Sequence, residues 1–197
     1  MSKQNSYTTA DYLPWDTAMS LIRHLYDDRK YRTSLLVGCG CFFGLRISDL
    51  LQLTWSQLLG NTEVVIREQK TGKRRAVKIN EKFRKHITLC HEAMAIRDDN
   101  RSCFLNRYGG ILSIQMANRE LKALKSDYNL PVSNFSTHSL RKTWARQIYE
   151  NENAKGRGEM ALLKLSELMN HSDPCITRRY IGLRQQELEE LYENLKF

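Results

Sequence analysis

Four short segments of the sequence carry side chains that together could transfer a phosphoryl group. Their six polar residues are, in chain order, Arg46, Lys70, His138, Arg141, His171 and Tyr180. Fixed cations and hydrogen-bond donors stabilise a phosphodiester as its charge grows in a pentavalent transition state, and arginine suits this through its planar fork of donors. A phenol could attack phosphorus and store the bond energy as a phosphotyrosine. The set therefore predicts cleavage and rejoining of a phosphodiester.

The sequence gives no sign of a metal or another cofactor. No group of carboxylates has the spacing of metal ligands, so this chemistry is expected to run without Mg²⁺. The five cysteines include no CxxC pair, which predicts reduced thiols rather than a zinc site or a disulfide framework. We expect no cofactor.

Charge is distributed unevenly along the 197 residues, whose formal net charge is +9. Nine basic and three acidic residues lie between Thr62 and His86, whereas acidic residues dominate from Gln185 onward. A basic stretch of this density favours contact with a polyanion such as nucleic acid. No apolar run is long enough to span a membrane, and the N-terminus lacks a secretory signal, so we expect a soluble, cytoplasmic protein.

Hydrophobic periodicity predicts an α+β fold that is mainly helical. Two runs rich in β-branched residues, 64–66 and 76–79, flank the sequence Lys70-Thr71-Gly72-Lys73 and indicate an antiparallel hairpin. The remaining apolar patterns predict helices around 15–25, 34–43, 48–53, 83–96, 114–128, 139–150, 160–169, from Pro174, and over 183–195.

The ordered polar set resembles the catalytic domain of the tyrosine recombinase (phage integrase) family. Singly each motif is weak, but their order, their local context and the step from His171 to Tyr180 agree with the family pattern. The resemblance implies that Arg46 and Arg141 hold the non-bridging oxygens of the scissile phosphate and that Lys70 protonates the departing 5′ oxygen. It also implies that His138 assists proton transfer, that His171 hydrogen-bonds the phosphate, and that Tyr180 forms a 3′-phosphotyrosyl bond.

Supporting residues follow from the same resemblance. Asp49 matches the family's acidic buttress, and its i, i+3 spacing from Arg46 could brace that arginine or a neighbouring histidine. Both Lys70 and Lys73 lie on the turn, but Lys70 fits the family's Lys-Thr-Gly context. We interpret Lys73, Arg74 and Arg75 as contacts to the DNA backbone.

Two stretches depart from the family pattern. The family usually has Leu-Gly-His where this chain has Met169-Asn170-His171. Asparagine tolerates unusual backbone angles nearly as well as glycine, so we expect the local geometry to be kept. The interval from Arg141 to His171 is longer than usual, and the polar segment 151–158 is interpreted as an inserted surface loop.

The resemblance also suggests an organisation and partners. We expect an N-terminal extension over 1–12, the catalytic domain over 13–182, and a C-terminal helix over 183–197 that packs in cis or on a neighbouring protomer. The expected partner is double-stranded DNA, with a homotetramer on DNA and a monomer when free. The favoured interpretation is a catalytic fragment of a mobile-element integrase; a short invertase of the fimbrial phase-switch type, a type IB topoisomerase-like enzyme and a DNA-binding module without turnover remain alternatives.

Overall fold

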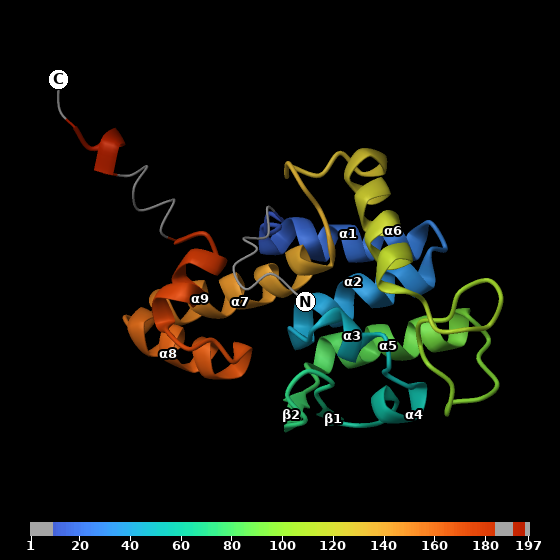
Figure 1. Cartoon of the computed structure of the whole chain (residues 1–197). Helices are drawn as coiled ribbons and strands as arrows, with labels where there is room; N and C mark the ends of the chain where they lie inside the picture. Colours follow the sequence, from blue (N-terminus) through green and yellow to red (C-terminus); the bar gives the residue numbers. More distant parts are fainter. Residues whose placement is uncertain (1–9, 184–190, 196–197) are drawn as a thin grey trace. The chain divides into compact units, whose positions relative to one another are not determined.

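Helices make up most of the polypeptide, and a two-stranded antiparallel sheet lies among them (Figure 1). The computed structural model describes residues 10–183 and 191–195. The described chain divides into two compact units, and the boundary falls between Trp144 and Ala145, inside one helix. The mainly helical fold with a small antiparallel sheet is as predicted.

The first unit contains most of the regular elements. They are α1 (Trp15–Asp27), α2 (Tyr31–Phe43), α3 (Ile47–Leu50), α4 (Trp55–Leu58), β1 (Glu63–Arg67), β2 (Arg74–Lys78), α5 (Glu81–Ala93), α6 (Ile114–Asp127) and the start of α7 (Thr137–Asn153). The second unit holds the rest of α7 with α8 (Gly158–Met169) and α9 (Pro174–Tyr180).

Helix α2 is the centre of the first unit because both of its faces are buried. One face, including Leu36 and Phe43, joins an apolar cluster with α4, the hairpin and α5. Another face, including Val37, joins a second cluster with α1 and α6. A helix that is apolar all round belongs inside the fold, as its sequence predicts. The C-terminal end of α2 is therefore a fixed point for the residues that follow it.

The end of α2 lies against helix α7 with almost no space between them. Gly44 terminates α2 in the left-handed conformation, with φ 57°. A Cβ atom on Gly44 would lie 2.1 Å from the Trp144 ring, and one on Gly40 would lie 2.6 Å from the Leu140 side chain. Glycine is thus required at Gly44 by its backbone angle and by the close approach. This contact brings the N-terminal half of α7 next to the segment that carries Arg46.

The hairpin has the predicted form. Strands β1 and β2 pair antiparallel, with Glu63 opposite Lys78 and Arg67 opposite Arg74. The connecting turn, residues 68–73, contains Gly72 at φ 69°. Val64 and Ile66 face the core, whereas the alternate positions of β1 are exposed. The side chains of Lys70 and its neighbours are therefore presented on a turn that leaves the core.

Helix boundaries differ from the predictions in several places. The predicted loop over 151–158 is wrong in extent, because α7 continues to Asn153 and α8 begins at Gly158. Helix α5 ends at Ala93, before Ile96, and α4 was not predicted. Of the predicted final helix, residues 184–190 and 196–197 lie outside the described residues. In the part of the chain that is described, no helix has both the length and the apolar character needed to cross a membrane.

Candidate active site

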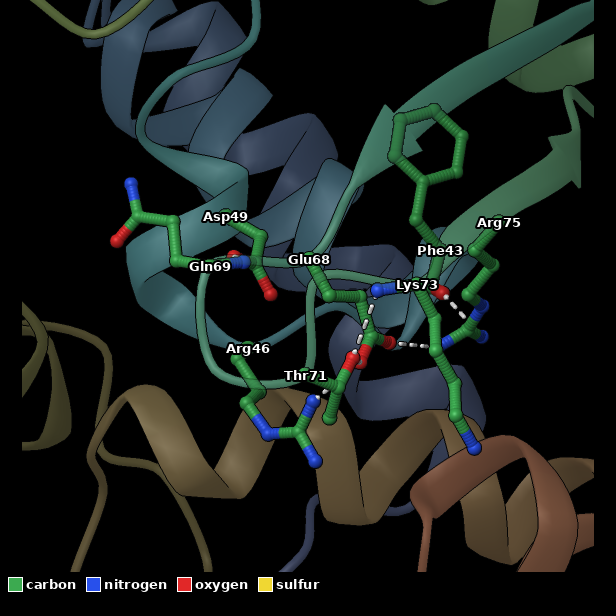
Figure 2. Close-up of polar contacts among 8 residues, drawn as sticks. All are labelled: Phe43, Arg46, Asp49, Glu68, Gln69, Thr71, Lys73 and Arg75. Carbon is green, nitrogen blue, oxygen red and sulfur yellow. Dashed lines mark hydrogen bonds and ion pairs between the residues drawn. The ribbon is translucent and has the colours of Figure 1, made fainter.

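The loop after α2 presents Arg46 at the start of a helix. Arg46 has extended backbone angles and occupies the N-cap position of α3, two residues after the left-handed Gly44. Its side chain is 21% exposed, and its Nη1 lies 2.7 Å from Oε2 of Glu68. The guanidinium is thus held by a carboxylate from the hairpin turn, as Figure 2 shows.

Lys70 occupies the middle of that turn, and its immediate neighbours are both anchored. The backbone N–H of Gln69 donates to Oδ1 of Asp49 at 2.9 Å. On the other side, the Thr71 hydroxyl donates to Oε2 of Glu68 at 2.8 Å. The Lys70 side chain is exposed and makes no hydrogen bond or ion pair with any residue that the structure describes. The backbone of Lys70 is fixed while its ammonium group faces solvent.

Glu68 is the acidic centre of this cluster, and its side chain is only 7% exposed. Its Oε1 also lies 3.7 Å from Nη1 of Arg75. Burial by itself raises the pKa of Glu68, but hydrogen bonds from Thr71 and Arg46, together with nearby arginine charge, outweigh burial and lower it. Glu68 is therefore ionised at neutral pH and holds two arginines and the turn at once.

Asp49 has a different partner from either of the two we considered. It is buried, with 4% of its surface exposed, and Oδ1 accepts the backbone N–H of Gln69. Its other oxygen, Oδ2, is buried and has no hydrogen-bond partner among the described residues. In this structure Asp49 supports the lysine-bearing turn, while Glu68 is the carboxylate paired with Arg46.

The three residues predicted to touch the DNA backbone lie in two different environments. Lys73 and Arg74 are exposed at the end of the hairpin. The Arg75 side chain is 11% exposed and is held by Glu68. Its Nη2 donates to the Phe43 carbonyl at 3.4 Å, and its guanidinium carbon lies 5.4 Å from the centroid of the Trp144 ring. Arg75 therefore joins the hairpin to α2 and α7, and of these three residues only Lys73 and Arg74 lie exposed at the surface.

Helix α7 carries His138 and Arg141 one turn apart. Arg141 is 6% exposed, and in the sequence it lies between Leu140 and Trp144, which pack against Gly40 and Gly44 respectively. His138 is exposed in the first turn. Desolvation of its ring is the largest cause that lowers the pKa of His138, and the charges of Lys142 and Arg141 add to it. The neutral imidazole is favoured at pH 7, as a proton acceptor requires.

In the second unit, the end of α8 sets the position of His171. Asn170 caps α8 in the left-handed conformation, with φ 56° and ψ 46°. The expectation that asparagine keeps a glycine-like geometry here is confirmed. Nδ1 of His171 lies 2.9 Å from the hydroxyl of Thr177, and that hydroxyl lies 2.7 Å from the hydroxyl of Ser166. A chain of buried neutral groups thus orients the imidazole.

Helix α9 is anchored at three points and presents Tyr180 at its C-terminal end. The Asp173 side chain accepts the Cys175 N–H at the start, and Thr177 is bonded in the middle. At the end, the buried Arg146 donates to the Ile181 carbonyl at 3.4 Å. The Tyr180 ring is half-buried and meets the His171 ring edge to face, with centroids 5.6 Å apart. These contacts fix the phenol relative to the histidine.

The six predicted residues are divided between the two units. Arg46, Lys70, His138 and Arg141 belong to the first, whereas His171 and Tyr180 belong to the second. Chemically, the first group can bind and neutralise an anion and donate or accept protons. The second group offers a nucleophile beside an oriented hydrogen-bonding ring.

Comparison with models of protein families shows to which family the chain belongs. The model of the phage integrase family matches residues 12–187, which is most of the chain. The protein is a member of the phage integrase family. This match confirms the resemblance to the family that the order of the six residues suggested.

The aligned region makes up most of one relative but only about half of another. The chain is 29% identical over 167 residues to "Probable integrase/recombinase YoeC" of Bacillus subtilis (strain 168), covering 84% of this chain and 86% of that protein. It is 30% identical over 153 residues to tyrosine recombinase XerC of Mesorhizobium japonicum, covering 77% of this chain and 46% of XerC. The chain thus spans nearly all of YoeC and about half of XerC.

Solved structures of recombinases share the fold of this family member. The crystal structure of XerA recombinase matches with a TM-score of 0.72 and 20% identity, covering 98% of this chain and 68% of XerA. A post-cleavage complex of XerH site-specific recombinase with palindromic difH substrate matches with a TM-score of 0.68 and 19% identity, covering 95% of this chain and 54% of XerH.

Three residues of the site were not found from the sequence: Glu68, Arg146 and Thr177. Glu68 carries a weak signal, because it is an acidic residue within the most basic stretch of the chain. Thr177 and Arg146 carry none, because their contacts depend on how α7, α8 and α9 pack. A buried hydroxyl or guanidinium becomes recognisable only when its partners are in place.

Proposed function

We propose that this protein is a site-specific DNA recombinase that cleaves and rejoins strands through a 3′-phosphotyrosyl intermediate on Tyr180. The observation that carries the proposal is the anchored Tyr180 ring against His171, in a chain of the phage integrase family that also retains Arg46, Lys70, His138 and Arg141. The proposed partner is double-stranded DNA, bound by a tetramer that forms from free monomers. DNA integration of a mobile element is the proposed biological role.

Each proposed step uses side chains of this chain. Tyr180 Oη bonds to phosphorus while the phosphorus–O5′ bond breaks, His138 accepts the phenolic proton, and Lys70 gives a proton to the departing 5′ oxygen. Arg46, Arg141 and His171 donate hydrogen bonds to the non-bridging oxygens, whose charge grows at the transition state. Attack by a 5′ hydroxyl on the phosphotyrosine then reverses these steps and releases the phenol.

Supporting evidence comes from how the groups are held. The His138 pKa is lowered, which favours the neutral form that accepts a proton. The proposed steps use only side chains of the protein and need no metal ion. The XerH complex, whose title gives a DNA substrate after cleavage, supports DNA as the partner of this fold.

The test is formation of a covalent protein–DNA adduct. A pool of duplexes with a randomised segment interrupted by a nick is incubated with the full chain, because strand release at the nick traps the intermediate. Wild-type protein and Tyr149→Phe, a control at another half-buried tyrosine, should give adducts that survive denaturation. Tyr180→Phe should give none. An adduct with Tyr180→Phe, or no adduct with wild-type protein, would contradict the proposal.

A further inference from the structure

The turn that carries Lys70 is held by two carboxylates, one from α3 and one from the start of the turn itself. Asp49, from α3, binds the backbone of Gln69 at 2.9 Å. Glu68 binds the hydroxyl of Thr71 at 2.8 Å and the guanidinium of Arg46 at 2.7 Å. Because Gln69 and Thr71 flank Lys70, both peptide segments around the lysine are fixed. Figure 2 shows the contacts of Thr71 and Arg46 meeting at the Glu68 carboxylate.

The turn is also closed by its own backbone. The Gly72 N–H donates to the Glu68 carbonyl at 2.8 Å, and the Glu68 N–H donates to the Lys73 carbonyl at 3.0 Å. Glu68 is therefore bonded to the turn through its backbone and to Arg46 through its side chain. A displacement of the Glu68 carboxylate would move the turn relative to Arg46.

A carboxylate in this position carries a cost for anion binding. Its negative charge opposes the attraction of Arg46 and Arg75 for a phosphate. Buried ion pairs are also weak contributors to stability, because desolvation offsets the attraction between the charges. The contact is therefore better explained by the geometry it imposes than by binding or stability.

We propose that Glu68 is a positioning residue that ties the turn 68–73 to Arg46 and so sets the reach of Lys70 towards the departing 5′ oxygen. This inference rests on the proposed function, because it assigns Lys70 the task of protonating that oxygen. Arg46 lies on a fixed part of the fold, directly after the Gly44–Trp144 contact. The order of support thus runs from α2 through Arg46 and Glu68 to the lysine.

The kinetic test compares two leaving groups in a duplex recovered from the adduct assay. One substrate has the natural 5′ oxygen at the scissile phosphate, and the other has sulfur there, which leaves as a thiolate and needs no proton. Glu68→Gln should slow adduct formation at least about tenfold on the oxygen substrate, the scale of a weakened proton transfer. On the sulfur substrate its rate should return to within about threefold of wild type, as should that of Lys70→Ala.

A matched control lies on the same hairpin. Glu63 is paired with Lys78 at 3.2 Å and is 44% exposed, so Glu63→Gln removes one carboxylate charge without touching the turn. It should keep the wild-type rate on both substrates. Hydrogen exchange without DNA gives a second measurement: the Gly72 amide should exchange faster in Glu68→Gln and unchanged in Glu63→Gln.

The outcomes separate the two proposals. Three results would overturn the role of Glu68 alone. The Glu68→Gln variant would react as fast as wild type on the oxygen substrate, or it would be equally slow on both substrates, or its Gly72 amide would exchange at the wild-type rate. In each of these cases wild-type protein still forms its adduct. Failure of wild-type protein to form any adduct would instead contradict the proposed function.

Discussion

The two units of this protein hold their functional side chains by different means. Around Arg46, position depends on ionised groups: a buried carboxylate, two arginines and a lysine-bearing turn. Around Tyr180, it depends mainly on two neutral hydroxyls, together with the imidazole that they contact and an edge-to-face ring contact. The difference matches the proposed tasks, because an anion site needs cations that are held apart from one another, whereas a nucleophile needs a defined direction.

The comparison extends to the backbone, because each unit has a helix cap in the left-handed conformation one or two residues before a functional residue. Gly44 precedes Arg46 with φ 57°, and Asn170 precedes His171 with φ 56°. Gly44 has no room for a side chain, whereas Asn170 is exposed and carries one. The same conformation thus occurs at a tightly packed glycine in one unit and at an exposed asparagine in the other.

The largest expected effect is on stability, and it should differ between the two cap residues, Gly44 and Asn170. Gly44→Ala should lower the free energy of unfolding by about 2–4 kcal/mol, because left-handed strain adds to the collision with Trp144. Asn170→Gly should change it by less than about 1 kcal/mol, since glycine adopts this conformation freely. Chemical denaturation of both variants measures the difference. Equal losses would mean that the Gly44–Trp144 contact does not constrain the fold.

A smaller effect is expected at Thr177, which tests the neutral side of the comparison. Thr177→Val keeps the shape of the residue but removes the hydroxyl between Ser166 and His171. It should cost about 1–3 kcal/mol of stability, the usual penalty for a buried polar group that loses its partner. Adduct formation should also slow, because the imidazole is no longer oriented, and Thr177→Ser should restore it. If Thr177→Val matches wild type in both assays, the hydroxyls of Thr177 and Ser166 do not position His171.

The smallest expected effect depends on pH, and it separates support by an ionised carboxylate from support by neutral hydroxyls. The Glu68 pKa is lowered in the folded protein, so its contribution to stability is complete above its unfolded pKa and is lost as the pH falls through the lowered value. The stability difference between wild type and Glu68→Gln, about 0.5–1.5 kcal/mol at pH 7, should therefore shrink towards pH 3. The Thr177→Val difference should stay constant between pH 5 and pH 3, because neither hydroxyl titrates. Denaturation curves measured across this pH range give both stability differences. If the difference between wild type and Glu68→Gln grows in acid, the ionised Glu68 carboxylate does not stabilise the fold.

Much of the fold was predictable because local signals agreed with the final structure. The Asn80 cap, the hairpin around Gly72 and the Asp173-Pro174 start of α9 all occur where their residue types place them. The boundary errors have a local cause. Asn151–Asn153 are polar and resemble a loop, but they continue α7 because a solvent-facing helix end tolerates such residues.

The sequence could propose the reacting side chains, but it could not predict the residues that hold them in the structure. Motif order is the basis for proposing Arg46 and Tyr180, since chemistry restricts which residue types can serve. Glu68 was passed over because its role depends on a contact across 22 positions of the sequence. Arg75 was interpreted as a surface contact because its sequence neighbours are basic, whereas the structure turns it inward to Glu68 and Trp144.

The most direct test of the central claim is to map the residue that carries the DNA. Because Arg179 precedes Tyr180 and Arg184 follows, trypsin should release the peptide Tyr180–Arg184 from a trapped adduct. After nuclease digestion, mass spectrometry should find this peptide with a nucleotide joined through its 3′ phosphate to the phenol. A nucleotide on any other peptide, such as one containing Tyr149, would contradict the account.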